Sequence, residues 1–516
     1  MSDDPPNIAP RSVLARLLAL KTAVHESEDG SGLKKVLGAF ELTMFGIGAI
    51  IGTGIFVLTG VAAAGGPHHQ GAGPAIVLSF IVTAVACGFA ALCYAEFASM
   101  IPVSGSAYTY AYASFGELMA WIIGWDLILE YAVGNVAIAI GWSGYFLNVL
   151  GECGIHLPAW LCIEPMTVRN AVASPSGYSA GIVELANTAL ATGPKIGGWT
   201  FSINLPAVMI VLMITGLLYF GVKESARFNA LLVFVKFAMI ALFLWVGLPH
   251  VDFATHWNPF MPNGFSGVMT GASIIFFAYI GFDAISTAAE ESKNPQRDLP
   301  IAMIGSLVIC TVLYVVVSIV LTGMVPLKML KNSEPVAEAL TSVGELTVAN
   351  IISLGAVLSI TSVLLVMQLA QTRIFFAMSR DGLLPAFLTK VHPRFGTPHI
   401  CTLLTGLVVA IPAGFIDINI AAEACNIGTL FAFTLVAIGI MILRVRQPNL
   451  RRGFVTPMVW ISAPMCVISC VSLMYFLTTI TWIRFGVWLA IGLVVYFCYG
   501  FHRSKLRLLG TQNSSI

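Results

Sequence analysis

Three ionisable side chains lie inside apolar stretches, where they could carry a proton or hold a charged solute. Lys236 and Glu130 are flanked by long apolar runs, and Asp283 follows the sequence Tyr-Ile-Gly-Phe. A charge at the bilayer centre costs about 2.5–3.5 kcal/mol even on the gentler insertion scale, so such residues pair or face a wet cavity. Burial favours the neutral forms of an acid and a lysine, whereas proximity favours both charged forms. Lys236 and Glu130 are therefore candidates for proton coupling.

The two residues lie at similar depth, ~16–20 Å from the cytoplasmic boundary at ~1.5 Å per helical residue. One interpretation is a pair whose protonation changes as a cavity opens and closes; the other is a static ion pair joining two helices. Asp126, one turn before Glu130, fits either role. Asp283 has three interpretations: a cap on an interrupted helix, a substrate contact or a proton carrier. Glu96 is interpreted as a gate or a structural hydrogen-bond acceptor.

Glycines interrupt the first apolar stretch, which reads GIGAIIGTGIF from Gly46 to Phe56. Glycine lowers helix propensity by roughly 1 kcal/mol relative to alanine. In lipid, an interrupted helix is tolerated only where its backbone faces protein or a water-filled cavity. The stretch is therefore either an unwound solute site or a small-residue seam for close helix packing.

Composition identifies the elements that must position these groups. The 516 residues are 58% hydrophobic and 10% charged, with a mean hydropathy of +0.89, which predicts an all-α polytopic membrane protein. Twelve apolar segments are long enough to span: 38–63, 75–100, 117–149, 204–221, 226–249, 266–289, 301–325, 347–378, 399–415, 419–443, 456–477 and 482–502.

Charge distribution predicts the orientation. With both termini in the cytoplasm, 20 lysines and arginines fall on the inner side and five on the outer side. We therefore expect a multi-pass protein of the cytoplasmic membrane, embedded in the lipid bilayer. A net charge of +1 leaves no basic surface for nucleic acid. No metal-binding cluster or nucleophile–base pair is visible in the spans, which argues against an enzyme and against a cofactor other than the coupling proton.

A second interrupted span is predicted at 266–289, where glycine and Asp283 stand at membrane depth. The two interrupted spans are the first and the sixth, the matching members of two five-helix sets. This pairing is typical of inverted-repeat transporters with a midplane site. A channel would need filter loops or charged rings, and none is visible.

Two interrupted helices suggest a type of ligand. Free N–H groups after Gly52 suit a carboxylate, because a helix N-terminus carries a positive dipole end. Free carbonyls around Ile50 and around Phe277 to Ile280 suit an ammonium. Held a few ångströms apart, these two groups describe the backbone of an α-amino acid.

Five stretches carry a resemblance to a known family. The chain resembles the amino acid–polyamine–organocation (APC) superfamily, and within it a bacterial member of the cationic amino acid transporter family. The similar stretches are Leu37–Gly60 (LGAFELTMFGIGAIIGTGIFVLTG), Tyr94–Tyr110 (YAEFASMIPVSGSAYTY), Gly221–Asn229 (GVKESARFN), Phe276–Pro300 (FFAYIGFDAISTAAEESKNPQRDLP) and Gln371–Pro385 (QTRIFFAMSRDGLLP).

The resemblance implies a LeuT-type fold: a 5+5 inverted repeat with broken helices 1 and 6, plus helices 11 and 12. The units would be a cytoplasmic tail, a first repeat with an extracytoplasmic loop, a second repeat, the last two helices and a second cytoplasmic tail. The tails would be 1–37 and 503–516. The first repeat would be 38–250, with the loop at 150–203 inside it. The second repeat would be 266–443, and the last two helices 456–502.

The resemblance also implies residue roles. Amides of Thr53 and Gly54 would meet the substrate carboxylate, and the carbonyls of Ile50, Phe277 and Ile280 its ammonium. Phe277 would gate the site, Asp283 matches an acid that members carry past the break, and Ile360 would line the side-chain pocket. Lys236 stands where sodium-coupled relatives bind sodium, which favours proton coupling.

These observations predict a proton-coupled α-amino-acid symporter that works by alternating access, with a neutral or broad substrate range. An amino acid or polyamine exchanger and a transport-inactive amino-acid sensor are the alternatives. Cys153 and Cys162 share the long outer loop, either bonded as a disulfide or as free thiols. The sequence leaves open a small membrane partner subunit.

Overall fold

The computed structural model describes residues 35, 37–66, 69–102, 105–197, 199–221, 226–332 and 334–505, and most of them are helical. The predicted tails, 1–37 and 503–516, lie almost entirely outside this part of the chain. Within it, nine helical segments are long and apolar enough to cross a membrane. Three shorter apolar helices coincide with the predicted fourth, ninth and eleventh spans. The all-helical membrane fold is therefore confirmed, whereas the count of twelve spans stays a prediction.

The helices follow the predicted segments closely. In chain order, the main ones are α2 (Ala39–Ile50), α3 (Thr59–Ala64), α4 (Ile76–Met100), α5 (Ser106–Ser114), α6 (Glu117–Glu152), α7 (Pro165–Ala173), α8 (Ala180–Thr192), α9 (Leu205–Phe220), α10 (Ala226–Gly247), α11 (Phe253–His256), α12 (Gly264–Ile275), α13 (Pro295–Met324), α14 (Pro335–Ser342), α15 (Leu346–Arg380), α16 (His399–Phe415), α17 (Ile418–Arg446), α18 (Val459–Tyr475), α19 (Thr479–Val495) and α20 (Phe501–Arg503).

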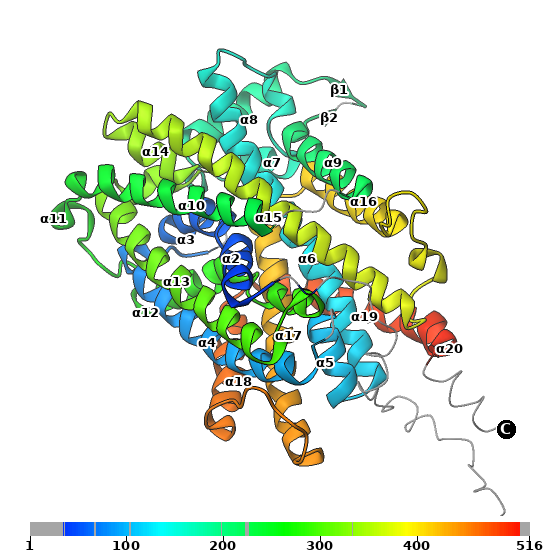
Figure 1. Ribbon diagram of the computed structural model, residues 1–516. Helices are drawn as coiled ribbons and strands as arrows, with labels where there is room; N and C mark the ends of the chain where they lie inside the picture. The colour runs from blue at the N-terminus through cyan, green and yellow to red at the C-terminus, as the bar shows by residue number, and fades with distance from the viewer. Residues whose placement is uncertain are drawn as a thin grey trace, which may run out of the picture.

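The interrupted spans lie innermost. In the spans 39–64 and 264–289, 89% and 94% of the most apolar stretch is buried, against 22% for the span 479–503. α6 packs along α15 and α17, and α2 packs against α13, α10 and α15 (Figure 1). Helices that are apolar all round must be covered by other helices or by lipid. The first and sixth spans are thus enclosed by protein, whereas the span 479–503 lies largely at the surface of the bundle.

The long loop forms a small layer of its own at one end of the helix bundle (Figure 1). α7 and α8 pack around a separate apolar cluster that includes Val168, Ala171 and Ala186. Strands β1 (Lys195–Ile196) and β2 (Trp199–Thr200) pair antiparallel beside them. Cys153 is exposed and Cys162 is buried, and both are free thiols, so the disulfide alternative is wrong for this structure.

Ion pairs and aromatic rings fasten the outer helices to this framework. The buried Glu96 of α4 accepts from Arg444 at 2.7 and 2.8 Å and from Arg452 at 3.1 Å. This geometry agrees with the interpretation of Glu96 as a structural acceptor. α19 is held against α6 by reciprocal bonds, because the indoles of Trp125 and Trp488 each donate to the other's carbonyl.

Candidate functional site

The first span is broken at the predicted place. α2 ends at Ile50, and Ile51 has extended backbone angles of −76° and 102°. Helical structure resumes at Thr53 with a π-helical turn, Gly54–Leu58, before α3. π-helical turns are frequent at functional sites. The glycine-rich stretch is therefore an interruption of the helix, as the first interpretation predicted.

The sixth span is broken as well. α12 passes into a 3₁₀ turn, Phe276–Tyr279, and Ile280 then adopts an extended ψ of 133°. Gly281 has a φ of 123°, a conformation that side chains other than glycine rarely adopt. The chain continues as a 3₁₀ helix, Asp283–Glu291.

The two breaks press against each other through their glycines. A Cβ on Gly54 would collide with the Cα and Cβ of Ala278, and one on Gly281 would lie 3.0 Å from the carbonyl carbon of Ala49. Each glycine thus admits the backbone of the other span. The small-residue seam was offered as an alternative to the break, but the structure combines the two.

Side chains from other helices satisfy carbonyls that the first break leaves free. The Lys236 ammonium donates to Gly48 O at 2.6 Å and to Ile51 O at 2.8 Å. The Tyr314 hydroxyl lies 2.9 Å from Ile50 O and 3.0 Å from Ala278 O. Buried backbone groups need such partners. Because a carbonyl has two lone pairs, Ile50 O can still accept from an ammonium.

The predicted pocket residues gather around the breaks. Ile50, Thr53, Phe277 and Ile280 are all buried, so the site is closed to solvent in this structure. The Thr53 hydroxyl has no hydrogen-bond partner among the described residues, although it is buried. The first amides of a helical segment lack an acceptor one turn back; in the segment after this break, the amide of Phe56 already donates to Gly52 O at 3.2 Å. Such amides suit an anionic group, and the binding of a substrate carboxylate at Thr53 and Gly54 stays a prediction.

Helix α15 covers the first break from the side. Val363 packs against Gly52, where an added Cβ would lie 2.7 Å from its Cγ2. The Ser359 hydroxyl lies 3.4 Å from Ile51 O. Ile360, between them, is fully buried. The structure thus places this part of α15 beside the break, and its role in a side-chain pocket stays a prediction.

Three acids lie together behind the break in the sixth span. Glu130 of α6 faces Asp283 and Asp126, and all three are at most 1% exposed. Asp283 accepts from Gly281 N at 3.2 Å and from the Tyr131 hydroxyl at 3.1 Å. Gly281 precedes the 3₁₀ helix Asp283–Glu291, so the first of these bonds satisfies an amide of the break; it does not cap the helix, whose start has no side-chain cap bond.

The predicted pairing of Lys236 with Glu130 is wrong for this conformation. Neither carboxylate oxygen of Glu130 has a hydrogen-bond partner among the described residues, whereas Lys236 donates to the first break. The bare carbonyls of an unwound helix compete for a buried ammonium, and the equal-depth argument did not include them. Whether either residue carries the coupling proton stays a prediction.

Sequence reasoning missed the tyrosines that support the breaks. Besides Tyr314, the buried Tyr145 of α6 donates to Phe56 O at 2.7 Å. A tyrosine at membrane depth needs an acceptor for its hydroxyl, and this requirement was the available signal.

Fold and site define a class: a polytopic membrane transporter built around two interrupted helices. The family model described as "Amino acid permease" matches residues 37–498. Relatives from Bacillus subtilis (strain 168) include a methylthioribose transporter, 46% identical over 96% of this chain and 99% of its own length. Another is a branched-chain amino acid permease, 46% identical over 95% and 98%. Cationic amino acid transporter 9, chloroplastic, of Arabidopsis thaliana is 36% identical over 84% and 70%.

The chain therefore belongs to the amino acid permease family, within the APC superfamily. The family and these relatives are transporters, which supports a transport role over an enzymatic one. The predicted resemblance is confirmed.

Proposed function

We propose that this chain carries α-amino acids across the cytoplasmic membrane by proton-coupled symport and alternating access. The fold would be LeuT-type, with inverted repeats at 38–250 and 266–443, helices 11 and 12 at 456–502, and both termini cytoplasmic. The observation that carries the proposal is the contact between two broken spans that leave peptide groups at a buried site. Donors at Thr53 and Gly54 suit a carboxylate, and acceptors at Ile50, Phe277 and Ile280 suit an ammonium.

Proton coupling is supported by the surroundings of the breaks. The Lys236 ammonium donates to backbone carbonyls at the break in the first span. Glu130, Asp126 and Asp283 lie close together beside the break in the sixth span. Like charges in a medium of low dielectric favour sharing a proton over full ionisation. A proton that enters this acid cluster, or leaves Lys236, would change the forces that hold the two breaks closed.

Amino acids with a neutral side chain, either branched or carrying a thioether, are the substrate class that the residues around the two breaks favour. Ile50, Ile280, Ile360 and Val363 surround the breaks with aliphatic surface, and Phe277 adds an aromatic ring. A relative that is 46% identical to this chain is a branched-chain amino acid permease, which agrees with this substrate class.

Transport of methylthioribose is the second candidate, because a 46% identical relative is a methylthioribose transporter. This solute carries neither an ammonium nor a carboxylate. The two candidates therefore differ in whether the peptide groups at the breaks bind charged ends.

Uptake into proteoliposomes tests the proposal. Competition by the twenty amino acids and by methylthioribose identifies the substrate. Accumulation under an inward proton gradient, with sodium absent, supports symport. Uptake that requires amino acid inside the vesicle supports an exchanger instead, and saturable binding without flux supports a sensor.

A further inference from the structure

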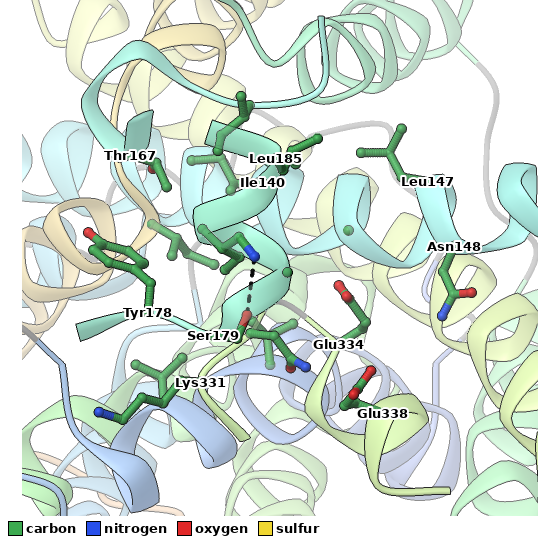
Figure 2. Close-up of a pocket in the computed structure, with 18 of the residues that line it drawn as sticks. Ile140, Leu147, Asn148, Thr167, Tyr178, Ser179, Leu185, Lys331, Glu334 and Glu338 are labelled. Atoms are coloured by element: carbon green, nitrogen blue, oxygen red, sulfur yellow. Dashed lines mark hydrogen bonds between the residues drawn. The ribbon is translucent and has the colours of Figure 1, made fainter. Parts of the chain in front are cut away.

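A large outer cavity adjoins the two breaks from the side of the long loop. Its volume is ≈ 1050 Å³, and Tyr178 and Ser179 line the wall that the loop forms (Figure 2). Val57, which stands one helical turn after Thr53, also lines it. A site that works by alternating access opens to one side at a time. The contacts that hold the opposite, inner side closed therefore decide when the site can open there.

The 3₁₀ helix Asp283–Glu291, the inner half of the sixth span, is held by two other helices. α5 packs against it, at the end of the bundle away from α8 (Figure 1). Arg373 of α15 donates to Thr287 O at 3.4 Å and to the Glu291 carboxylate at 3.2 Å. This half of the span can therefore move only if α5 and the end of α15 let it go.

The C-terminal segment 496–505 bonds to a buried carboxylate at the start of α6. Glu117 accepts from the Tyr496 hydroxyl at 2.9 Å and also from the Ser504 hydroxyl. It accepts as well from the Tyr112 hydroxyl of α5, at 3.1 Å. Glu117, Tyr496 and Ser504 are fully buried, so water does not compete for these bonds. Bonds to an ionised acceptor are roughly twice as strong as neutral ones. One carboxylate thus joins the C-terminal segment to α5.

The same segment contacts the end of α15. The amide of Lys505 donates to Asp381 O at 3.0 Å, directly after that helix. The Asp381 carboxylate accepts from the Tyr108 hydroxyl of α5 at 2.7 Å. Gly382 has a φ of 81°, and an added Cβ would collide with Arg503 O, so glycine is required for this close approach. The C-terminal segment therefore connects the two helices that hold the inner half of the sixth span.

We propose that the C-terminal segment is a latch, which keeps the inner side of the buried site closed by holding α5 and the end of α15 together. Removing a contact that is made only in the closed state shifts the population toward the open state. Glu117 is then a positioning residue, because it acts on the site through α5. The inference rests on the proposed function, since it assumes that the site opens to each side in turn.

The reactivity of two introduced cysteines measures the latch without transport. Full-length protein in nanodiscs has the exposed Cys153 and Cys498 replaced by serine and carries either Ala288→Cys or Val61→Cys. Ala288 is 3% exposed in the inner half of the sixth span, and Val61 lines the outer cavity. A water-soluble maleimide reaches both faces of a nanodisc, so the labelling rate reports how often each position is open.

Weakening the latch should affect the two reporters differently. Ser504→Ala and Tyr496→Phe each remove one hydroxyl from Glu117. Both should make Ala288→Cys react at least about tenfold faster, as expected for the loss of a hydrogen bond to a charged group, and should not speed the reaction of Val61→Cys. Tyr475→Phe is the matched control, because Tyr475 is 78% exposed on α18, and it should leave both rates unchanged.

Two results would overturn the latch. One is an unchanged rate at Ala288→Cys in either folded variant, with folding checked by size-exclusion chromatography. The other is faster labelling of both reporters, because that pattern indicates a general loosening of the protein. If the parent protein takes up no amino acid in proteoliposomes, the proposed function fails, while the labelling rates still decide the latch.

Discussion

Replacing Lys236 with methionine removes a charge that the structure places directly on the backbone of the first break. Methionine keeps the length of the side chain and loses the two bonds to Gly48 O and Ile51 O, at 2.6 and 2.8 Å. Lys236 is fully buried, so water cannot replace these bonds. We expect Lys236→Met to fold and to lose the response of uptake to a proton gradient.

The expected change in the free energy of unfolding is the difference between two opposing contributions. Two hydrogen bonds to a charged donor contribute about 3–6 kcal/mol. Removing a buried charge from the membrane returns about 2.5–3.5 kcal/mol. The net destabilisation is therefore about 0–3 kcal/mol, which a protein of this size tolerates. Lys236→Ala adds a cavity and should be less stable, with the same loss of pH response.

Initial uptake rates measure the effect, with the vesicle interior at pH 7.5 and the exterior at pH 5.5 or 7.5. Wild type should be faster at pH 5.5, and Lys236→Met should show equal rates. Ser359→Ala is the matched control, because it removes a neutral donor 3.4 Å from Ile51 O and should keep the wild-type rate ratio. A wild-type ratio in Lys236→Met would refute this reasoning, and equal rates in wild type would refute proton coupling itself.

Three further predictions concern packing and charge. Gly54→Ala should reduce uptake more than tenfold by forcing the two breaks apart, whereas Gly88→Ala, with nothing within 4 Å of the added Cβ, should transport normally. Glu96→Gln should lower the apparent melting temperature markedly, because breaking a buried ion pair costs about 3–5 kcal/mol; unchanged melting would contradict its structural role. Burial raises the pKa of Glu164 in the outer loop to about 7 from its ordinary value of 4.5. The folded state then binds the proton more tightly, so stability should fall by up to about 3 kcal/mol as pH rises from about 4.5 to 7. Thermal unfolding at pH 5 and pH 8 should show this fall in wild type and not in Glu164→Gln.

The helices and their breaks were predictable because they depend on local sequence. About twenty apolar residues specify a span. The glycines around Gly52 and Gly281 have low helix propensity, and the two spans approach each other closely there, so the helices break at these points. Burial of both interrupted spans follows from the same argument, since only protein can cover their free peptide groups.

The partners of the buried side chains were not predictable from spacing. Depth placed Lys236 near Glu130, but its target depends on helix rotation and on carbonyls that exist only once the first span has unwound. The support from Tyr314 and the outer cavity beneath α8 likewise depend on which residues of distant segments meet. Composition cannot supply that information.

The account depends most on the claim that the peptide groups of the two breaks hold both charged ends of a zwitterion. Competition for uptake of the best amino acid measures this directly, using its decarboxylated amine and its deaminated acid as competitors. Each analogue lacks one charged end and should compete at least a hundredfold more weakly than the amino acid itself. An amine or an acid that competes as well as the parent amino acid would contradict the claim.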